Sequence, residues 1–275
     1  MMEAISVQGL SFSYSGGRPV LKNISFNVEA GETFVIAGLS GSGKTTLCNI
    51  LAGIIPHSIN GDLTGHTQIF GESGNTENHC TADRTRTPGD SGNTETTNTK
   101  DHSQTPGESG KSKINTMTGL VFQDSDAQII CTTVEDELAF GLENLCMPPD
   151  EIRRRVDETA ATFGLTDMLL QNPSKLSGGQ KRVMMIAAVL MTEPRILILD
   201  EPMNSLDQDG RALVRNCIDR LRDEGRTVLI VEHELESVTF ADRWLIIEDG
   251  EIAALDTPES LLRDREKLRA MGLIV

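Results

Sequence analysis

Short aliphatic runs alternate with longer amphipathic stretches along much of this chain. Thr33–Ala37, Ile196–Leu199 and Thr227–Glu232 are nearly continuous hydrophobic runs. Such runs are typical of strands that are buried on both faces of a parallel sheet. Because these runs are separated by segments with helical periodicity, the pattern predicts an α/β fold with a mainly parallel sheet.

Two regions depart from the simple alternation of strand and helix. Ala4–Gln8 and Ile24–Glu29 precede the first helix and predict an antiparallel β region at the N-terminus. Between residues 123 and 177 the pattern is helical, with predicted helices at Thr133–Leu145 and Asp150–Phe163. We therefore expect a helical subdomain inserted into an α/β core.

Residues 72–113 contain mostly Thr, Gly, Asn, Ser and acidic residues, with almost no apolar side chains. The motif Gly-(Glu/Asp)-Ser-Gly recurs there, starting at Gly71, Gly89 and Gly107. A segment of this composition buries too little apolar surface to offset the entropy of ordering it. The sequence therefore predicts a disordered, low-complexity repeat insertion between two strands, Thr67–Phe70 and Gly119–Phe122.

The loop after the first aliphatic run matches the pattern G-x-x-x-x-G-K-[ST] over Gly38–Thr45. Its glycines let the backbone N–H groups turn toward phosphate oxygens, at the positive end of a helix that starts near Gly43. Lys44 would reach the β- and γ-phosphates, and the Thr45 hydroxyl would bind Mg²⁺. A chance glycine loop is the alternative, and the strand before it and the helix after it argue against that alternative.

Asp200 and Glu201 follow the run Ile196–Leu199 and would lie at the carboxyl end of a central strand. Open α/β sheets place their ligands at this edge. Asp200 would hold Mg²⁺, and Glu201 would accept a proton from an attacking water molecule. An ordinary strand end with solvated acids is the alternative, and the presence of the phosphate loop makes it weaker.

The segment Leu176–Gln180, Leu-Ser-Gly-Gly-Gln, precedes the helical stretch 181–190. The Ser177 and glycine amides at this helix start predict a second anion site. Since one chain needs a single cradle for its nucleotide, this second site would serve the nucleotide of another subunit. The alternative is a Ser N-cap followed by glycines, which is a common way to begin a helix.

Together, the phosphate loop, the Leu-Ser-Gly-Gly-Gln segment and the Asp200-Glu201 pair resemble the ATPase subunits of ABC transporters. This resemblance implies a P-loop NTPase (RecA-like) core and further site residues. Tyr14 would stack on adenine, although a packed edge aromatic is the alternative. Gln123 would sense Mg²⁺ and water, and Ser205-Leu206-Asp207 resembles the loop that crosses the dimer interface. His233 would contact the γ-phosphate.

The expected site comprises three sets of residues. The catalytic residues are Glu201, His233 and Gln123. The ligands of Mg²⁺ are Thr45, Gln123 and Asp200. The residues that bind ATP are Tyr14, Gly38, Ser40, Gly41, Ser42, Gly43, Lys44, Thr45, Thr46, Ser177, Gly178, Gly179 and Gln180.

Within this family, the segments 123–130, 133–144, 242–244 and 249–252 resemble the energy-coupling factor (cobalt and vitamin uptake) ATPases. The sequence departs from the family pattern at Ser125, at Met203-Asn204-Ser205 and at Val183. The resemblance implies a single ABC ATPase domain over 1–275. Its nucleotide-binding core would be 1–123 and 176–275, and its helical subdomain 124–175.

The same resemblance implies a second ATPase subunit, a transmembrane coupling subunit and a substrate-binding membrane subunit as partners, at the cytoplasmic face of the membrane. Three alternatives stay open: the ATPase of another ABC importer class, a soluble ABC ATPase acting on chromosomes or ribosomes, and a nucleotide-dependent regulatory module without turnover. The transported substrate is not encoded in an ATPase subunit, and a homodimer and a heterodimer fit equally well.

The amino-acid composition limits the partners and the cellular compartment that fit this chain. The chain has 41 acidic and 25 basic residues and a formal charge of −16, which argues against nucleic acid as a partner. Its five cysteines, an odd number without close pairing, are typical of a reduced cytosol. The N-terminus lacks the pattern of a secretion signal. The longest apolar run, Val183–Met191, is too short to span a bilayer, so another chain would form the pore.

Overall fold

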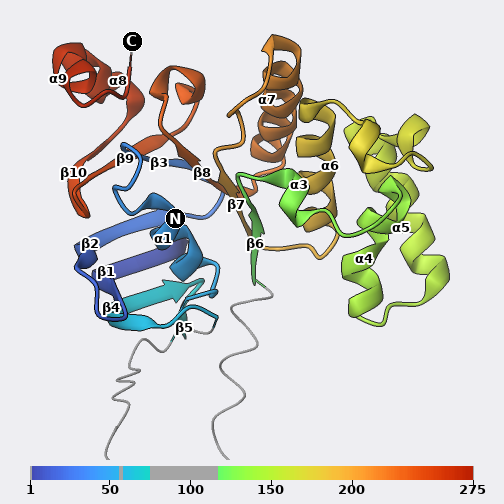
Figure 1. Cartoon of the computed structure of the whole chain (residues 1–275), viewed down its shortest axis with the longest axis horizontal. Helices are drawn as coiled ribbons and strands as arrows, with labels where there is room; N and C mark the ends of the chain where they lie inside the picture. The colour runs from blue at the N-terminus through green and yellow to red at the C-terminus, as the bar shows by residue number, and fades with distance from the viewer. Residues whose placement is uncertain (1, 56–57, 75–116, 275) are drawn as a thin grey trace, which may run out of the picture.

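The computed structural model describes residues 2–55, 58–74 and 117–274 and contains two sheets (Figure 1). The first sheet is antiparallel, with the strand order β2-β1-β4-β5. Its strands are β1 (Glu3–Tyr14), β2 (Pro19–Glu29), β4 (Gly61–Ile69) and β5 (Glu72–Gly74). The predicted N-terminal antiparallel region is therefore confirmed.

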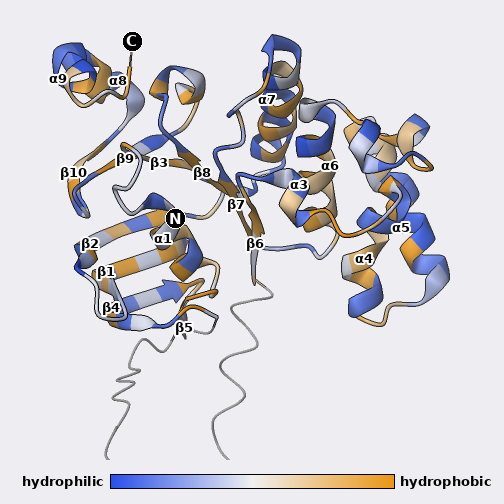
Figure 2. Ribbon diagram, in the orientation of Figure 1, coloured by the Kyte–Doolittle hydropathy of each residue, from blue (hydrophilic) through white to orange (hydrophobic). Residues whose placement is uncertain are grey.

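The second sheet has six strands in the order β10-β9-β3-β8-β7-β6, and only its edge strand β10 is antiparallel to its neighbour. The strands are β3 (Thr33–Ala37), β6 (Thr118–Val121), β7 (Ile196–Asp200), β8 (Thr227–Glu232), β9 (Arg243–Glu248) and β10 (Glu251–Asp256). Every residue of β3, β7 and β8 is buried, as the aliphatic runs predict. Figure 2 shows the same hydrophobic strands at the centre of the molecule.

Helices lie on both sides of the six-stranded sheet. They are α1 (Lys44–Leu51), α3 (Ser125–Gln128), α4 (Val134–Asn144), α5 (Pro149–Phe163), α6 (Gly178–Leu190), α7 (Gln208–Asp223), α8 (Pro258–Leu261) and α9 (Arg265–Ala270). Short 3₁₀ turns occupy Thr166–Met168, Pro173–Lys175, Leu235–Val238 and Leu262–Asp264. Within the described ranges, no helix combines the length and apolar character needed to cross a membrane.

The six-stranded sheet is buried between two hydrophobic cores because side chains along a strand alternate between its faces. On β7, Ile196 and Ile198 face a core shared with the antiparallel sheet and α1. Leu197 and Leu199 face the other core, which contains residues of α4, α5, α6 and α7. With both faces covered, the polar ends of the central strands are the part of the sheet left to bind a ligand.

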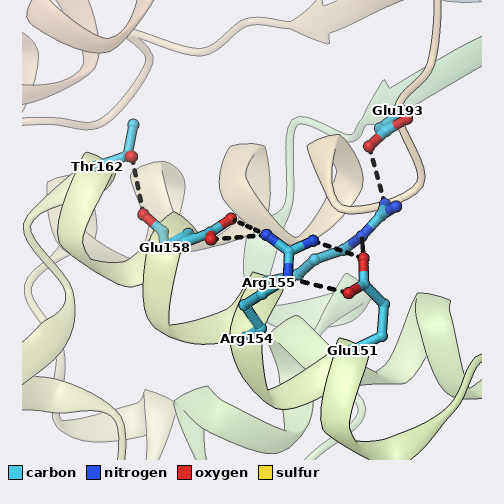
Figure 3. A network of polar contacts seen from close by, with 6 residues as sticks. All are labelled: Glu151, Arg154, Arg155, Glu158, Thr162 and Glu193. Carbon is cyan, nitrogen blue, oxygen red and sulfur yellow. Dashed lines mark hydrogen bonds and ion pairs between the residues drawn. The ribbon is translucent and has the colours of Figure 1, made fainter.

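The helical region is joined to the core by packing and by polar contacts. In α5, Arg154 binds Glu151 and Glu158, and Arg155 reaches Glu193 in the turn between α6 and β7 at 2.8 Å (Figure 3). The hydrogen bonds from Arg154 and Arg155 lower the pKa of Glu151 to about 2. These pairs lie at the surface, so they orient α5 more than they stabilise it. The boundaries 124 and 175 of the helical subdomain stay a prediction.

The start of the predicted insertion belongs to the antiparallel sheet. Residues 72–74 form β5, in which Glu72 pairs with Ile69 and Gly74 with Thr67. The two residues between the paired strands, Phe70 and Gly71, both have positive φ (48° and 77°). This is the geometry of a tight hairpin turn, and it returns the chain onto β4 without needing an apolar pattern. The rest of the predicted insertion, 75–113, lies outside the described residues.

Because β5 is part of the sheet, a deletion that tests the predicted insertion begins after Gly74. We expect that removing residues 75–113 and joining Gly74 to Ile114 through a short Gly/Ser link preserves folding and most ATPase activity. Long surface loops add little closure free energy, about 0.6 kcal/mol for each doubling of length. Thermal unfolding and an ATPase assay check this, with wild type cut by trypsin first near Arg84, Arg86 or Lys100. A large fall in melting temperature would show that the segment is folded.

Candidate nucleotide site

A cleft of about 650 Å³ opens where the loop after β3 meets the ends of β6, β7 and β8. Residues from six separate stretches of the chain line it: Tyr14, Val20, Leu39, Ser40, Gly41, Gly43, Lys44, Thr45, Thr46, Gln123, Glu201 and His233. Eight of the predicted site residues before position 177 therefore line this cleft together with Glu201 and His233. The parallel sheet brings them together because its strands end at one edge.

The loop between β3 and α1 has a backbone that only glycine adopts easily. Gly41 and Gly43 have φ values of 83° and 105°. At Gly43, a Cβ atom would lie 2.8 Å from Leu21 Cδ2 and 3.0 Å from the Val20 carbonyl, so a side chain does not fit. The buried Ser42 hydroxyl has no hydrogen-bond partner among the described residues. A polar atom without a partner in a tight glycine loop fits an anion such as phosphate.

Lys44 is the first residue of α1 and is only 5% exposed. Its Nζ donates hydrogen bonds to the carbonyls of Gly38 (2.8 Å) and Leu39 (3.0 Å), so the side chain lies along the loop that precedes it. Burial lowers the pKa of Lys44, while the nearby Glu201 and Asp200 oppose that shift. A desolvated cation at a helix start is a strong attractor for phosphate.

Thr45, which lines the cleft, contacts the buried Asp200 at the end of β7. The Thr45 hydroxyl donates to Asp200 Oδ2 at 3.4 Å, which is long for a hydrogen bond between two oxygens. Burial, and then the negative charge of Glu201, raise the pKa of Asp200. A buried carboxylate beside a hydroxyl in this position is a suitable donor set for a hard divalent cation that also takes phosphate oxygens.

Glu201 follows β7 in a strained left-handed conformation, with φ of 46°. Such strain in a residue other than glycine persists where surrounding contacts enforce it, and here the Glu201 N–H donates to the Val231 carbonyl at 2.9 Å. Gln123 Nε2 donates to Glu201 Oε2 at 2.7 Å. His233 Nδ1 lies 3.7 Å from Glu201 Oε1 and is a buried atom without a hydrogen bond among the described residues.

Tyr14 closes the outer side of the cleft. Its hydroxyl lies 3.0 Å from the Thr46 hydroxyl, which ties the ring to α1. Phe12 packs edge-on against the same ring, with the centroids 5.0 Å apart. Tyr14 is 39% exposed, which leaves room for contact with a planar ligand. These contacts fit both the predicted stacking on adenine and a well-packed aromatic.

Ser177–Gln180 does not line the cleft. Ser177 caps α6: its hydroxyl accepts a hydrogen bond from the Gln180 N–H, and the Gln180 side chain accepts one from the Ser177 N–H. Gly179 packs against Gly210 of α7, where a Cβ would come 2.5 Å from the Gly210 Cα. Gly178 lines a separate hollow beside Gln123 and Ser205. Within its own chain, this segment therefore forms a capped helix start away from the cleft.

Two residues at the site were not predicted. Arg182 is buried in α6 and donates to the carbonyls of Phe122 (2.7 Å) and Gln123 (2.8 Å), which fixes the loop after β6. Asn204 donates from Nδ2 to Glu201 Oε2 at 2.9 Å. The only sequence signal for Asn204 is the departure from the family pattern at Met203-Asn204-Ser205, and for Arg182 the sequence gives no such signal.

Comparison with known proteins agrees with this geometry. Residues 21–204 match the family model "ABC transporter". The energy-coupling factor transporter ATP-binding protein EcfA1 of Mycoplasmoides gallisepticum is 32% identical over 271 residues, which cover 98% of this chain and 84% of that protein. EcfA of Methanosarcina acetivorans is 35% identical over 269 residues, covering 98% and 85%.

A solved structure of cbiO1 from Clostridium perfringens, part of the ABC transporter complex cbiONQ, superposes with a TM-score of 0.78 at 27% identity. The match covers 99% of this chain and 96% of that one. The cleft lined by the phosphate loop, the family match and the near full-length relatives agree with one another. The chain belongs to the ABC transporter ATP-binding family, and it is an ATP-binding subunit and ATP hydrolase of that type.

Proposed function

We propose that this chain is the ATPase of an energy-coupling factor type importer and that it works as a head-to-tail pair. The observation that carries the importer type is the near full-length similarity to two proteins named as energy-coupling factor ATPases. The substrate is ATP in the cleft between Tyr14 and His233, and the products are ADP and phosphate. The pair would close when it binds ATP and open after hydrolysis, and this motion would drive import by the membrane partner.

In the chemical step, water attacks the γ-phosphorus, a new P–O bond forms, and the bond to the β-phosphate oxygen breaks. Lys44 and the N–H groups of its loop bind the phosphates and stabilise their negative charge. Glu201 accepts the proton of the attacking water. His233 supports this role, because it lines the cleft and its Nδ1, which has no hydrogen-bond partner in the described part of the chain, lies 3.7 Å from Glu201 Oε1.

The site also fits Mg²⁺. Thr45, Asp200 and Gln123 would hold the ion together with phosphate oxygens, and their donor atoms are the oxygens that Mg²⁺ prefers. The contact of 3.4 Å between the Thr45 hydroxyl and Asp200 Oδ2 supports this assignment, because two oxygens that are not tightly hydrogen-bonded to each other could both bind an ion. When bound, the ion would neutralise charge on the phosphates.

A pair of chains would explain why Ser177–Gln180 lies outside the cleft of its own chain. The amides of Gly178 and Gly179, at the start of a 13-residue helix, would meet the nucleotide of the partner chain. The Ser177 hydroxyl accepts a bond from the Gln180 N–H, which leaves its own hydrogen to donate to a phosphate. Each ATP would then contact Lys44 of one chain and Ser177 of the other.

The helical region offers a surface for the membrane partner. Ile130 (66% exposed) and Leu170 (82% exposed) are large apolar side chains in the stretch 124–175. Exposed apolar residues that lie close together, although they come from loops far apart in the sequence, are typical of a protein interface. Val134 and Glu135 donate backbone hydrogen bonds to the carbonyls of Gln171 and Leu169, which places these two loops side by side. This supports a transmembrane coupling subunit as partner.

Purification of the tagged chain from detergent-solubilised membranes of its native cells tests the importer assignment. We expect a transmembrane coupling subunit and a small substrate-binding membrane subunit to co-purify. Ile130→Asp should remove both while ATPase activity stays within about twofold, because the charge disrupts an apolar interface outside the cleft. Leu213→Asp, at an exposed leucine of α7, is the matched control and should keep both partners.

Recovery of the chain only from the soluble fraction, with ribosomes or chromosomal DNA, would instead favour a soluble ABC ATPase. Recovery with a membrane protein complex that lacks a small substrate-binding subunit would favour another importer class. Either result would reject the energy-coupling factor assignment while leaving the ATPase chemistry in place.

A further inference from the structure

The carboxylate of Glu201, just after β7, accepts a hydrogen bond from Asn204, a residue at which the sequence departs from the family pattern. Two amide side chains donate to the same oxygen, Glu201 Oε2: Gln123 Nε2 at 2.7 Å and Asn204 Nδ2 at 2.9 Å. They approach from different elements, because Gln123 follows β6 and Asn204 follows β7. Among the residues that the structure describes, no amide side chain donates to the other oxygen, Oε1, which lies 3.7 Å from His233 Nδ1.

The orientation of the Asn204 amide is fixed by its neighbour. The Ser205 hydroxyl donates to Asn204 Oδ1 at 3.3 Å. This leaves Nδ2 as the end that faces Glu201, and the opposite orientation would place a carbonyl oxygen against a carboxylate oxygen. Ser205 itself has a positive φ of 59°. The backbone N–H of Asn204 also donates to the Glu201 carbonyl at 3.2 Å, which closes a tight turn over the carboxylate.

We propose that Asn204 is a positioning residue for ATP hydrolysis, holding Glu201 so that Oε1 is the oxygen that accepts the proton. This inference rests on the proposed role of Glu201 as the base. A carboxylate with one donor can rotate about its side-chain bonds. Two donors on Oε2, from two different elements, restrict that rotation and keep Oε1 directed toward His233 and the cleft.

If Asn204 positions Glu201 and does not bind ATP, its loss should change kcat and leave KM nearly unchanged. We expect Asn204→Ala to lower kcat about tenfold, because misplacement of a base slows the chemical step. The KM for ATP should stay within about twofold, since Asn204 does not line the cleft and would not touch the nucleotide. Asn204→Asp keeps the shape but replaces the donor with an acceptor, and it should reduce kcat more than Asn204→Ala does.

The control is Asn144→Ala, the same substitution at an exposed amide at the end of α4, which should behave as wild type. Single-turnover rates with radiolabelled ATP in the Glu201→Ala background provide the decisive comparison. If Asn204 acts through Glu201, then adding Asn204→Ala to Glu201→Ala should cause little further loss. A tenfold further loss there, or wild-type kcat in Asn204→Asp, would overturn the inference.

The two claims fail in different ways. Wild-type turnover in Glu201→Ala would remove Glu201 as the base, and with it the premise of the inference. Loss of turnover in Glu201→Ala together with full turnover in Asn204→Ala would leave the base in place and reject the role of Asn204 alone.

Discussion

Glu201→Gln should bind ATP with wild-type affinity and hydrolyse it at least about a hundredfold more slowly. The reason is that general-base catalysis contributes roughly 10²- to 10⁴-fold, and the amide of glutamine does not accept a proton at neutral pH. The substitution keeps the shape and leaves Lys44 and its loop unchanged. Binding of a fluorescent ATP analogue and release of phosphate are the two measurements.

The same variant should accumulate as an ATP-bound dimer, because hydrolysis is the step that opens the pair. Size-exclusion chromatography with ATP and with ADP reports this directly. Asp209→Asn, at an exposed carboxylate in the first turn of α7, is the matched control and should keep wild-type turnover. Wild-type turnover in Glu201→Gln would show that another group takes the proton.

The strands at the centre of the sheet could be predicted because their sequence signal is local. Thr33–Ala37 was expected as a strand and is β3, residue for residue. The same holds for β8, at Thr227–Glu232. A fully buried strand needs an unbroken aliphatic run, and few other structures favour one. The phosphate loop could also be predicted from the sequence, because its backbone geometry requires glycines.

Two hairpin turns show that a local sequence signal predicts some turns and misses others. The turn between β9 and β10 is Asp249-Gly250, with φ of 48° and 80°, and Asp-Gly is a strong turn signal. The turn between β4 and β5 has nearly the same φ values, but its first residue is Phe70. Phenylalanine rarely adopts positive φ, so the return of residues 72–74 to the sheet could not be predicted from the residue types in this turn.

The contacts of the site itself were the least predictable part. Which atoms of Gln123 and Asn204 meet Glu201 depends on the relative placement of β6 and β7, which the sequence does not specify. The left-handed backbone at Glu201 is likewise invisible in the sequence, because glutamate has no preference for it. The residue types indicated the chemistry, and the structure supplies the orientation of each group.

In the proposed pair, one chain supplies Lys44 and another supplies Ser177 to the same ATP. Mixing two inactive variants, Lys44→Ala and Ser177→Arg, tests this shared site. Each mixed dimer would combine the intact Lys44 of one chain with the intact Ser177 of the other, giving one complete site. Phosphate release by an equal mixture should then recover to about a quarter of the wild-type rate, since half of the dimers would be mixed.

Separate affinity tags on the two variants show whether mixed dimers form. Each variant alone should stay inactive, Lys44→Ala through loss of phosphate binding and Ser177→Arg through a bulky charge at the start of α6. Phosphate release should recover when the two variants are mixed. Mixed dimers that form and yet release no phosphate would contradict the shared site.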